Sequence, residues 1–169
     1  MNFKTISTTI DELKNKWSTP QTAYHHKEKC PFLLSCIFTG GIDEKELPKP
    51  HQNFPCELLA LWRLSEKTEL FKDNLYEQWG LELLTPKEAI SETSRQQQIR
   101  GNEILTTDIV LGRFYGDSEL LIITKDGGVL VCTPLDHRHE WTKAAESLSE
   151  FLEKMADAEG AKFWESSAT

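Results

Sequence analysis

The hydrophobic pattern near the start of the chain has the period of a helix. Residues at i, i+4, i+7 and i+11 form one apolar stripe, namely Ile6, Ile10, Leu13 and Trp17. Thr9 and Glu12 have the spacing of a capping box, in which a threonine hydroxyl and a glutamate carboxylate bind free amides at a helix start. Pro20 ends the segment. We therefore expect a helix before residue 20, capped at Thr9.

Two further helices are expected in the middle of the chain. Pro55 suits a first helical position, and an apolar face follows it at Leu58, Leu59, Leu61 and Trp62. Residues 81–84 are typical of a short strand. Thr85 then provides a helix cap, Pro86 a first helical position and Glu88 the capping-box partner. This helix is expected to run to about Gln97, with a polar loop after it.

The clearest β pattern covers residues 108–133. It contains three β-rich runs, DIVLGRFYG, ELLIIT and GVLVCT, separated by turns at Gly116-Asp117 and Asp126-Gly127. Asp-Gly accommodates positive φ at little cost, so the second turn predicts a tight hairpin. The three runs together predict an antiparallel meander.

The end of the chain predicts a last helix over about residues 142–158. Its apolar stripe is formed by Ala144, Ala145, Leu148, Phe151, Leu152 and Met155. Phe163 and Trp164 in the tail are expected to fold back on the body. Residues 21–54 are less informative, because PFLLSCIF at 31–38 fits either a buried strand or a short helix. Three prolines in residues 46–55 predict an extended connector.

These elements predict an α+β fold, in which an antiparallel β-meander sheet has helices packed on one side. We expect an N-terminal helical extension over 1–53, helix plus connector, packed on the core. The α+β domain then covers 54–158, and 159–169 form a C-terminal tail. No apolar stretch approaches the roughly 20 residues that a membrane helix needs, and no secretory signal is visible. The expected location is the cytoplasm, with the four cysteines reduced.

Charge narrows the classes of partner. The chain carries 19 Lys+Arg and 27 Asp+Glu, a formal net charge of −8. Residues 1–54 hold 7 lysines and 6 acidic residues, whereas residues 55–169 hold 12 basic and 21 acidic residues. Because nucleic-acid affinity comes from cations that neutralise phosphates, direct nucleic-acid binding is not expected. The acidity fits either solubility alone or attraction to a basic protein.

No motif for catalysis or for a metal or cofactor is recognised. Cys30, Cys36 and Cys56 lack zinc-ligand spacing. His137 and His139 would face the same way on a strand, but a solvated polar loop fits them better. Nucleophile elbows and phosphate-binding glycine loops are missing from the sequence. We expect no enzymatic activity and no cofactor; a hydrolase using a hidden Cys/His pair is the alternative.

The order of motifs over residues 54–157 resembles the SUKH superfamily. FPCELLALW at 54–62 is similar to its opening helix, and LELLTPKEAISET at 81–93 to its short strand and following helix. The run at 108–133 resembles the family meander, and AAESLSEFLEKMA at 144–156 its closing helix. Residues 66–78 are interpreted as an insertion relative to that pattern.

The resemblance implies an α+β fold without a catalytic set. Bacterial members are mostly immunity proteins, which bind and neutralise a toxin domain, often a nuclease, from contact-dependent or other polymorphic toxin systems. The expected function is therefore that of an antitoxin with a basic partner. The alternative is a non-enzymatic adaptor with several partners, as in eukaryotic members. From charge and expected exposure, the candidate contact residues are Asp117, Glu119, Asp126, Glu146, Glu150 and Glu153.

Overall fold

The computed structural model describes residues 3–48 and 54–165 of the chain. In chain order their elements are α1 (Ile6–Trp17), β1 (Gln21–His25), β2 (Glu28–Phe38), the 3-10 helix η1 (Glu44–Glu46), α2 (Cys56–Leu64), β3 (Thr68–Asp73), β4 (Leu81–Leu83), α3 (Pro86–Ile99), β5 (Ile109–Phe114), β6 (Leu120–Ile123), β7 (Val129–Cys132), the 3-10 helix η3 (Arg138–Glu140), β8 (Thr142–Ala145) and α4 (Leu148–Asp157). In these ranges no helix is long and apolar enough to cross a membrane. The connector predicted over 46–55 lies partly outside them, at residues 49–53.

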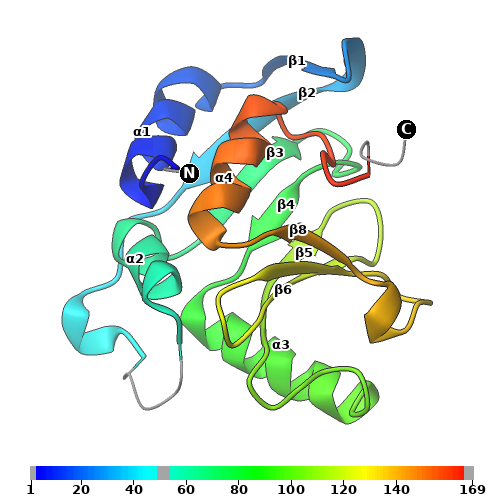
Figure 1. The fold of residues 1–169 in the computed structure, drawn as a ribbon. Helices are drawn as coiled ribbons and strands as arrows, with labels where there is room; N and C mark the ends of the chain where they lie inside the picture. The colour runs from blue at the N-terminus through cyan, green and yellow to red at the C-terminus, as the bar shows by residue number, and fades with distance from the viewer. Residues whose placement is uncertain (1–2, 49–53, 166–169) are drawn as a thin grey trace.

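All eight strands belong to one antiparallel sheet whose spatial order follows the sequence, β1 to β8 (Figure 1). The meander predicted over 108–133 is confirmed as β5, β6 and β7, and the sheet extends beyond it on both sides. Each strand pairs with the next one along the chain, so every connection is a hairpin or a loop carrying a helix. The α+β class is therefore confirmed.

Three helices cover one face of the sheet and form the main core. α1 contacts α2, α4 and β2, while α4 also contacts β8 (Figure 1). The largest fully buried side chains there include Trp62, Phe71 and Phe151. Burial of each such side chain stabilises the fold by about 2–3 kcal/mol. The indole of Trp62 also donates a 3.0 Å hydrogen bond to the carbonyl of Leu84, so its polar group is satisfied.

α3 packs against β5, away from these three helices (Figure 1). The Thr93 hydroxyl of α3 accepts a 2.8 Å hydrogen bond from the Val110 amide of β5. The helix side chain thus satisfies a β5 amide at a position beyond the end of the short strand β4. Alternate residues of β5–β7, with Ile104 and Trp141, form a second, smaller apolar cluster. Across β5–β7, the face opposite the three helices therefore carries an apolar cluster of its own.

The two predicted capping boxes have different outcomes. The one at α3 is confirmed, because the Thr85 hydroxyl accepts from the Glu88 amide and the Glu88 carboxylate accepts from the Thr85 amide, both at 3.1 Å. The one at Thr9 is wrong. The cap of α1 is Thr5, whose hydroxyl accepts from the Thr8 amide at 3.2 Å. Thr9 lies one turn inside the helix and is buried.

The single helix predicted over 142–158 is wrong at its start. Residues 142–145 form β8, which pairs with β7, and α4 begins only at Leu148. Ser147 separates the two elements, since its hydroxyl accepts from the Glu150 amide at 3.1 Å and caps a new helix. α3 also ends at Ile99, two residues later than predicted.

The open question about PFLLSCIF is resolved in favour of a strand. It forms most of β2, an 11-residue strand between β1 and β3. β3 itself lies at residues 68–73, inside the interval interpreted as an insertion. Within the described part of residues 1–53, α1, β1 and β2 contribute side chains to the main core and strands to the common sheet.

The described part of the tail folds back over the core, as predicted. Trp164 belongs to the main core cluster, and the Trp79 indole donates a 2.9 Å hydrogen bond to the Gly160 carbonyl. Gly160 has φ +89, and a Cβ built there would lie 2.4 Å from the Cβ of Phe71. A glycine is therefore required twice over, for its backbone conformation and for the close approach of Phe71.

We predict that Gly160→Ala destabilises the protein by about 2–4 kcal/mol, from positive φ and from overpacking against Phe71. The matched control is Gly127→Ala in the β6–β7 turn. Gly127 has nearly the same φ, +90, but nothing lies within 4 Å of the added carbon, so only about 1 kcal/mol is expected. Urea unfolding measures both, and equal losses would contradict the packing argument.

Candidate functional site

The face of β3–β5 opposite the three helices carries charged side chains. Leu81 and Leu83 point into the core, so Glu82 between them points to the other face. Cross-strand pairing places Glu82 opposite Glu69 on β3 and opposite Arg113 on β5. A row of ionisable groups therefore crosses three neighbouring strands on this face.

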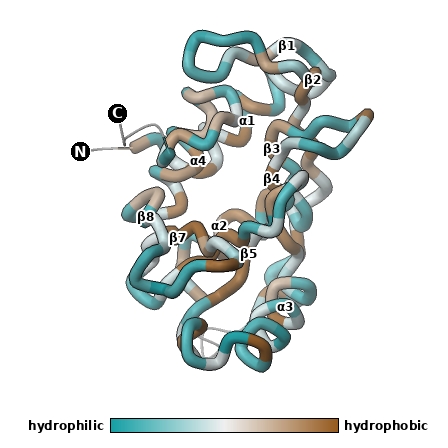
Figure 2. Tube along the Cα trace, turned by 90° about the vertical axis from the view of Figure 1, so that its right-hand side faces the viewer, coloured by the Kyte–Doolittle hydropathy of each residue, from teal (hydrophilic) through white to brown (hydrophobic). Residues whose placement is uncertain are grey.

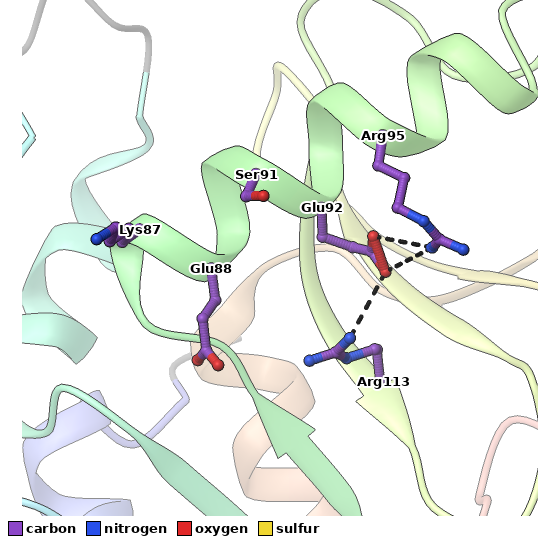
Figure 3. Close-up of a pocket in the computed structure, with 6 residues that line it drawn as sticks. All are labelled: Lys87, Glu88, Ser91, Glu92, Arg95 and Arg113. Atoms are coloured by element: carbon purple, nitrogen blue, oxygen red, sulfur yellow. Dashed lines mark hydrogen bonds and ion pairs between the residues drawn. The ribbon is translucent and has the colours of Figure 1, made fainter.

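The first turns of α3 add a second row of charges beside the sheet. Glu88, Glu92 and Arg95 lie at i, i+4 and i+7 and point toward β4 and β5 (Figure 3). The Glu92 side chain is only 8% exposed, and its carboxylate pairs with Arg95 at 3.2 Å and with Arg113 at 3.7 Å. Arg113 also lies 3.5 Å from Glu82. Glu92 thus pairs with one arginine of its own helix, Arg95, and connects the helix to the sheet through the other, Arg113.

Lys67, just before β3, connects the row of charges on the sheet with the row on α3. Its ammonium pairs with Glu82, and with Glu88 at 2.7 Å. Burial acts to raise the pKa of Glu88, but the Lys67 ammonium and the Thr85 amide outweigh it, so the pKa lies below its ordinary value. Glu88 consequently remains ionised near neutral pH, and Lys67 holds it beside Glu82.

A third group of partners continues the network over β3 and the end of β5. The Tyr115 hydroxyl donates a 2.6 Å hydrogen bond to Glu69, which also pairs with Lys72 at 2.9 Å. The Lys72 ammonium lies 4.8 Å from the centre of the Tyr115 ring. Burial and the neighbouring Glu69 raise the pKa of the Tyr115 phenol. The phenol therefore stays protonated and acts as a donor.

Two adjoining hollows form a groove between α3 and the sheet, called the α3 groove below. One, of about 540 Å³, is lined by Lys87, Glu88, Ser91, Glu92, Arg95 and Arg113 (Figure 3). The other, of about 560 Å³, shares its last three residues and extends past Ile99 to the β5–β6 turn. Most lining groups are charged, unlike the largely apolar pockets that bind small molecules.

The described residues contain no group of three or more His, Cys, Asp or Glu side chains able to hold a metal ion. All four cysteines are free, and three are buried. Burial raises the pKa of Cys36 to about 12 and that of Cys132 to about 11. Because the thiolate is the nucleophile, these two thiols are poorly suited to covalent chemistry.

His137 and His139 lie at the 3-10 helix η3, not on a strand. Their rings stack with centres 5.8 Å apart, and Nδ1 of His137 lies 2.8 Å from the Glu103 carboxylate. That hydrogen bond raises the pKa of His137. The pair therefore stabilises a surface loop, in agreement with the polar-loop interpretation.

The candidate contact residues do not form one cluster. Asp117 and Glu119 line the far end of the α3 groove, where both pair with Lys162 of the tail. Asp126 accepts a hydrogen bond from the Gly128 amide at 3.2 Å and so stabilises its own hairpin turn. These three acidic side chains thus already have partners within the protein, and they stabilise the contacts of the tail and of the hairpin turn.

Glu146, Glu150 and Glu153 were expected on one exposed helical face, and this is wrong. Glu146 precedes α4 and is exposed, pairing with Lys143 at 2.7 Å. Glu150 is buried, at 8% exposure, and its carboxylate accepts from the Glu146 amide and pairs with Lys154. Glu153 accepts a 3.1 Å hydrogen bond from the Lys4 amide. Only Glu146 keeps the expected exposure.

Sequence reasoning missed the central residues of the groove, Glu82, Glu92 and Arg113. The pattern contained a partial signal, because a glutamate between two leucines in a strand must point away from the core.

No protein-family model matches the chain, and no curated protein matches it significantly.

We predict that Glu92→Gln costs about 1–3 kcal/mol of stability. The amide leaves two guanidinium groups facing a neutral side chain in a nearly buried position. Glu146→Gln is the matched control, because this ion pair is 77% exposed on the glutamate side and is worth at most about 0.5 kcal/mol. Chemical unfolding measures both; losses of the same size would refute the structural role of Glu92.

A pH dependence follows from Glu69. Burial acts to raise its pKa, but the hydrogen bonds from Lys72 and Tyr115 outweigh this, so the folded-state pKa lies below its ordinary value of 4.5. Its stabilising effect is thus present above pH 4.5 and is lost as the pH falls through the lower folded pKa.

We therefore expect the stability difference between the wild type and Glu69→Gln to shrink as the pH is lowered below 4.5. Tyr115→Phe, which removes one donor to Glu69, should show a smaller change with pH than the wild type. Urea unfolding at several pH values tests this, and a difference that grows on acidification would contradict the assigned pKa direction.

Proposed function

We propose that the protein is an immunity protein, which binds a toxin domain one-to-one and neutralises it without chemical turnover. The observation that carries this proposal is the α3 groove. It is a continuous surface of paired charges, held in place by a helix and a sheet. Side chains that are already oriented lose little entropy on binding, which favours tight association with a rigid partner.

The charge distribution supports a basic partner such as a nuclease domain. Residues 55–169, which contain the whole groove, hold 12 basic and 21 acidic residues. An acidic protein attracts a basic one over long distances and speeds their encounter. Asp117 and Glu119 lie in the groove, and Glu146 and Asp126 are exposed carboxylates outside it, so these four are the preferred first contacts.

The resemblance of residues 54–157 to the SUKH superfamily supports the same class of function. It brings expectations of a bacterial immunity role and of a cytoplasmic location to this chain. An adaptor would bind several partners weakly, whereas an immunity protein binds one partner tightly. If the gene immediately upstream encodes a toxin domain, co-expression of this protein with that domain should restore growth.

Blocking the groove provides the sharpest test. Ser91 is exposed, lines the groove and takes no part in its ion pairs, so Ser91→Trp fills the hollow without breaking the network. Ser94 lies on the same helix, is exposed and is not among the lining residues, which makes Ser94→Trp the matched control.

We expect Ser91→Trp to weaken binding to the toxin domain at least tenfold in titration calorimetry, while Ser94→Trp binds as the wild type does. The association rate should fall with added salt, because opposite charges are then screened. Equal affinities for the two variants would exclude the groove as the binding site. Turnover of a small compound, abolished by one substitution, would overturn the non-enzymatic proposal.

A further inference from the structure

The tail of the chain, residues 159–165, is anchored on both sides of Lys162. Before it, the indole of Trp79 donates a 2.9 Å hydrogen bond to the Gly160 carbonyl. Trp79 belongs to the β3–β4 turn, which projects from the body of the molecule (Figure 2). After it, the side chain of Trp164 is buried in the main core cluster. The Lys162 side chain can therefore change its position while the backbone on either side stays bound.

The Lys162 side chain extends from this tail into a cage of two aromatic rings and two carboxylates. Its ammonium pairs with Asp117, and with Glu119 at 2.7 Å. The ammonium also lies 5.5 Å from the ring centre of Trp79 and 5.3 Å from that of Phe114. Carboxylates and aromatic faces both attract an alkylammonium group. We call these four residues the ammonium cage, and within it the Lys162 side chain is only 14% exposed.

Bonds that do not involve the ammonium hold the cage in shape. The second carboxylate oxygen of Asp117 accepts a 2.9 Å hydrogen bond from the Glu119 amide. The Phe114 amide donates to the Glu119 carbonyl at 3.1 Å, across the β5–β6 turn. Trp79 is fixed by its bond to the tail carbonyl. The cage is thus pre-organised, so an ammonium that enters it requires no rearrangement of the cage.

The ammonium cage lies at the end of the α3 groove where contacts with a basic partner are proposed. Phe114, Asp117 and Glu119 all line the groove there. Burial acts to lower the pKa of Lys162, but the two carboxylates outweigh it, so the pKa lies above its ordinary value. The lysine is therefore charged at neutral pH, and it neutralises part of the negative charge that these carboxylates would present to a partner.

A lysine of the partner can make the same contacts that Lys162 makes. Exchange of one ammonium for another keeps the ion pairs and ring contacts of the cage unchanged in number. Lys162 has the advantage of its tether, which gives it an effective concentration in roughly the millimolar range. A partner lysine acquires the same advantage once the rest of its surface has docked in the groove. Until docking occurs, Lys162 keeps the cage occupied.

From these contacts we propose that Lys162 is an autoinhibitory contact of the α3 groove. In the free protein its ammonium occupies the ammonium cage, and a lysine side chain of the docking partner takes its place there. The displaced side chain turns away to solvent while the tail remains bound to Trp79 and the core. The apparent affinity for the partner is reduced by the fraction of molecules whose cage is open. This inference rests on the proposed function, because it concerns the partner that this function requires.

Removal of the ammonium should strengthen partner binding. We expect Lys162→Ala to bind a toxin domain that the wild type neutralises in co-expression about fivefold more tightly, or better, in titration calorimetry, because the cage no longer has to be vacated. Lys29→Ala is the matched control. Lys29 is exposed on β2 and lines neither hollow of the groove, so its loss makes the same change in net charge. Its affinity should stay within about twofold of the wild type, since a distant charge acts mainly on the encounter rate.

A second measurement needs no partner. Propylammonium replaces the part of the side chain that Lys162→Ala removes, so it should bind in the emptied cage. At about ten times its Kd, it should raise the Tm of Lys162→Ala by about 3–6 °C. It should leave the Tm of the wild type unchanged, because that cage is occupied. Sodium chloride at the same concentration and the neutral 1-propanol are the controls, and neither should stabilise the variant relative to the wild type.

Equal or weaker toxin binding by Lys162→Ala and by Lys162→Met would overturn the autoinhibition and leave the proposed function standing, because the wild type still binds. The methionine variant keeps an apolar chain against the two rings, so the test does not depend on the fold of the alanine variant. Failure of propylammonium to stabilise Lys162→Ala would also overturn the inference. A wild type that binds no toxin domain would instead contradict the proposed function, and the propylammonium result would then decide whether the cage accepts an ammonium.

Discussion

The burial of one face of the sheet under α1, α2 and α4 is the constraint on which the rest of the molecule depends. A strand alternates its side chains between two faces, so every leucine that enters this core commits its neighbour to the opposite face. On β3–β5 those neighbours are charged. They lie half-buried beside α3, where an unpaired charge is costly, and this is why each carboxylate there has a cationic or hydrogen-bonding partner.

The resulting network determines what the groove is suited to do. An isolated exposed ion pair contributes little to stability, but Glu92 is nearly buried and pairs with two arginines from different elements. Such a carboxylate orients its partners and holds α3 to the sheet. Because the cations and anions neutralise one another within the groove, the arrangement favours complementary protein contacts over the activation of a nucleophile. The raised pKa values of the buried thiols agree with this interpretation.

Local signals in the sequence were sufficient for much of the fold. The hydrophobic runs of β5–β7 and the capping box at Thr85 need only neighbouring residues, and both were predicted correctly. β3 was missed because Leu70 and Phe71 are consecutive and both buried, with φ +51 at Phe71, which breaks the period-two pattern. β8 was assigned to the last helix because Ala144 and Ala145 continue the apolar stripe of α4. Pairing with β7, a tertiary effect, outweighed that local preference.

The α3 groove was harder to predict, because it depends on long-range pairing. Glu82, Glu92 and Arg113 meet only after β4 pairs with β5 and α3 turns back between them. From charge alone, Asp126 and Glu146 were predicted to be contact residues, but both lie outside the α3 groove. The acidic residues that matter most in the groove are those whose charge is already balanced, and composition does not distinguish them.

We propose that a partner protein binds over α3 and the open face of β4 and β5. Hydrogen–deuterium exchange of the protein, alone and with a toxin domain that it neutralises in co-expression, would locate that contact. We expect slowed exchange in the first turns of α3, in β4 and β5, and in the β5–β6 turn, with α1 unchanged. Protection confined to α1 and α4, on the helical layer, would contradict it.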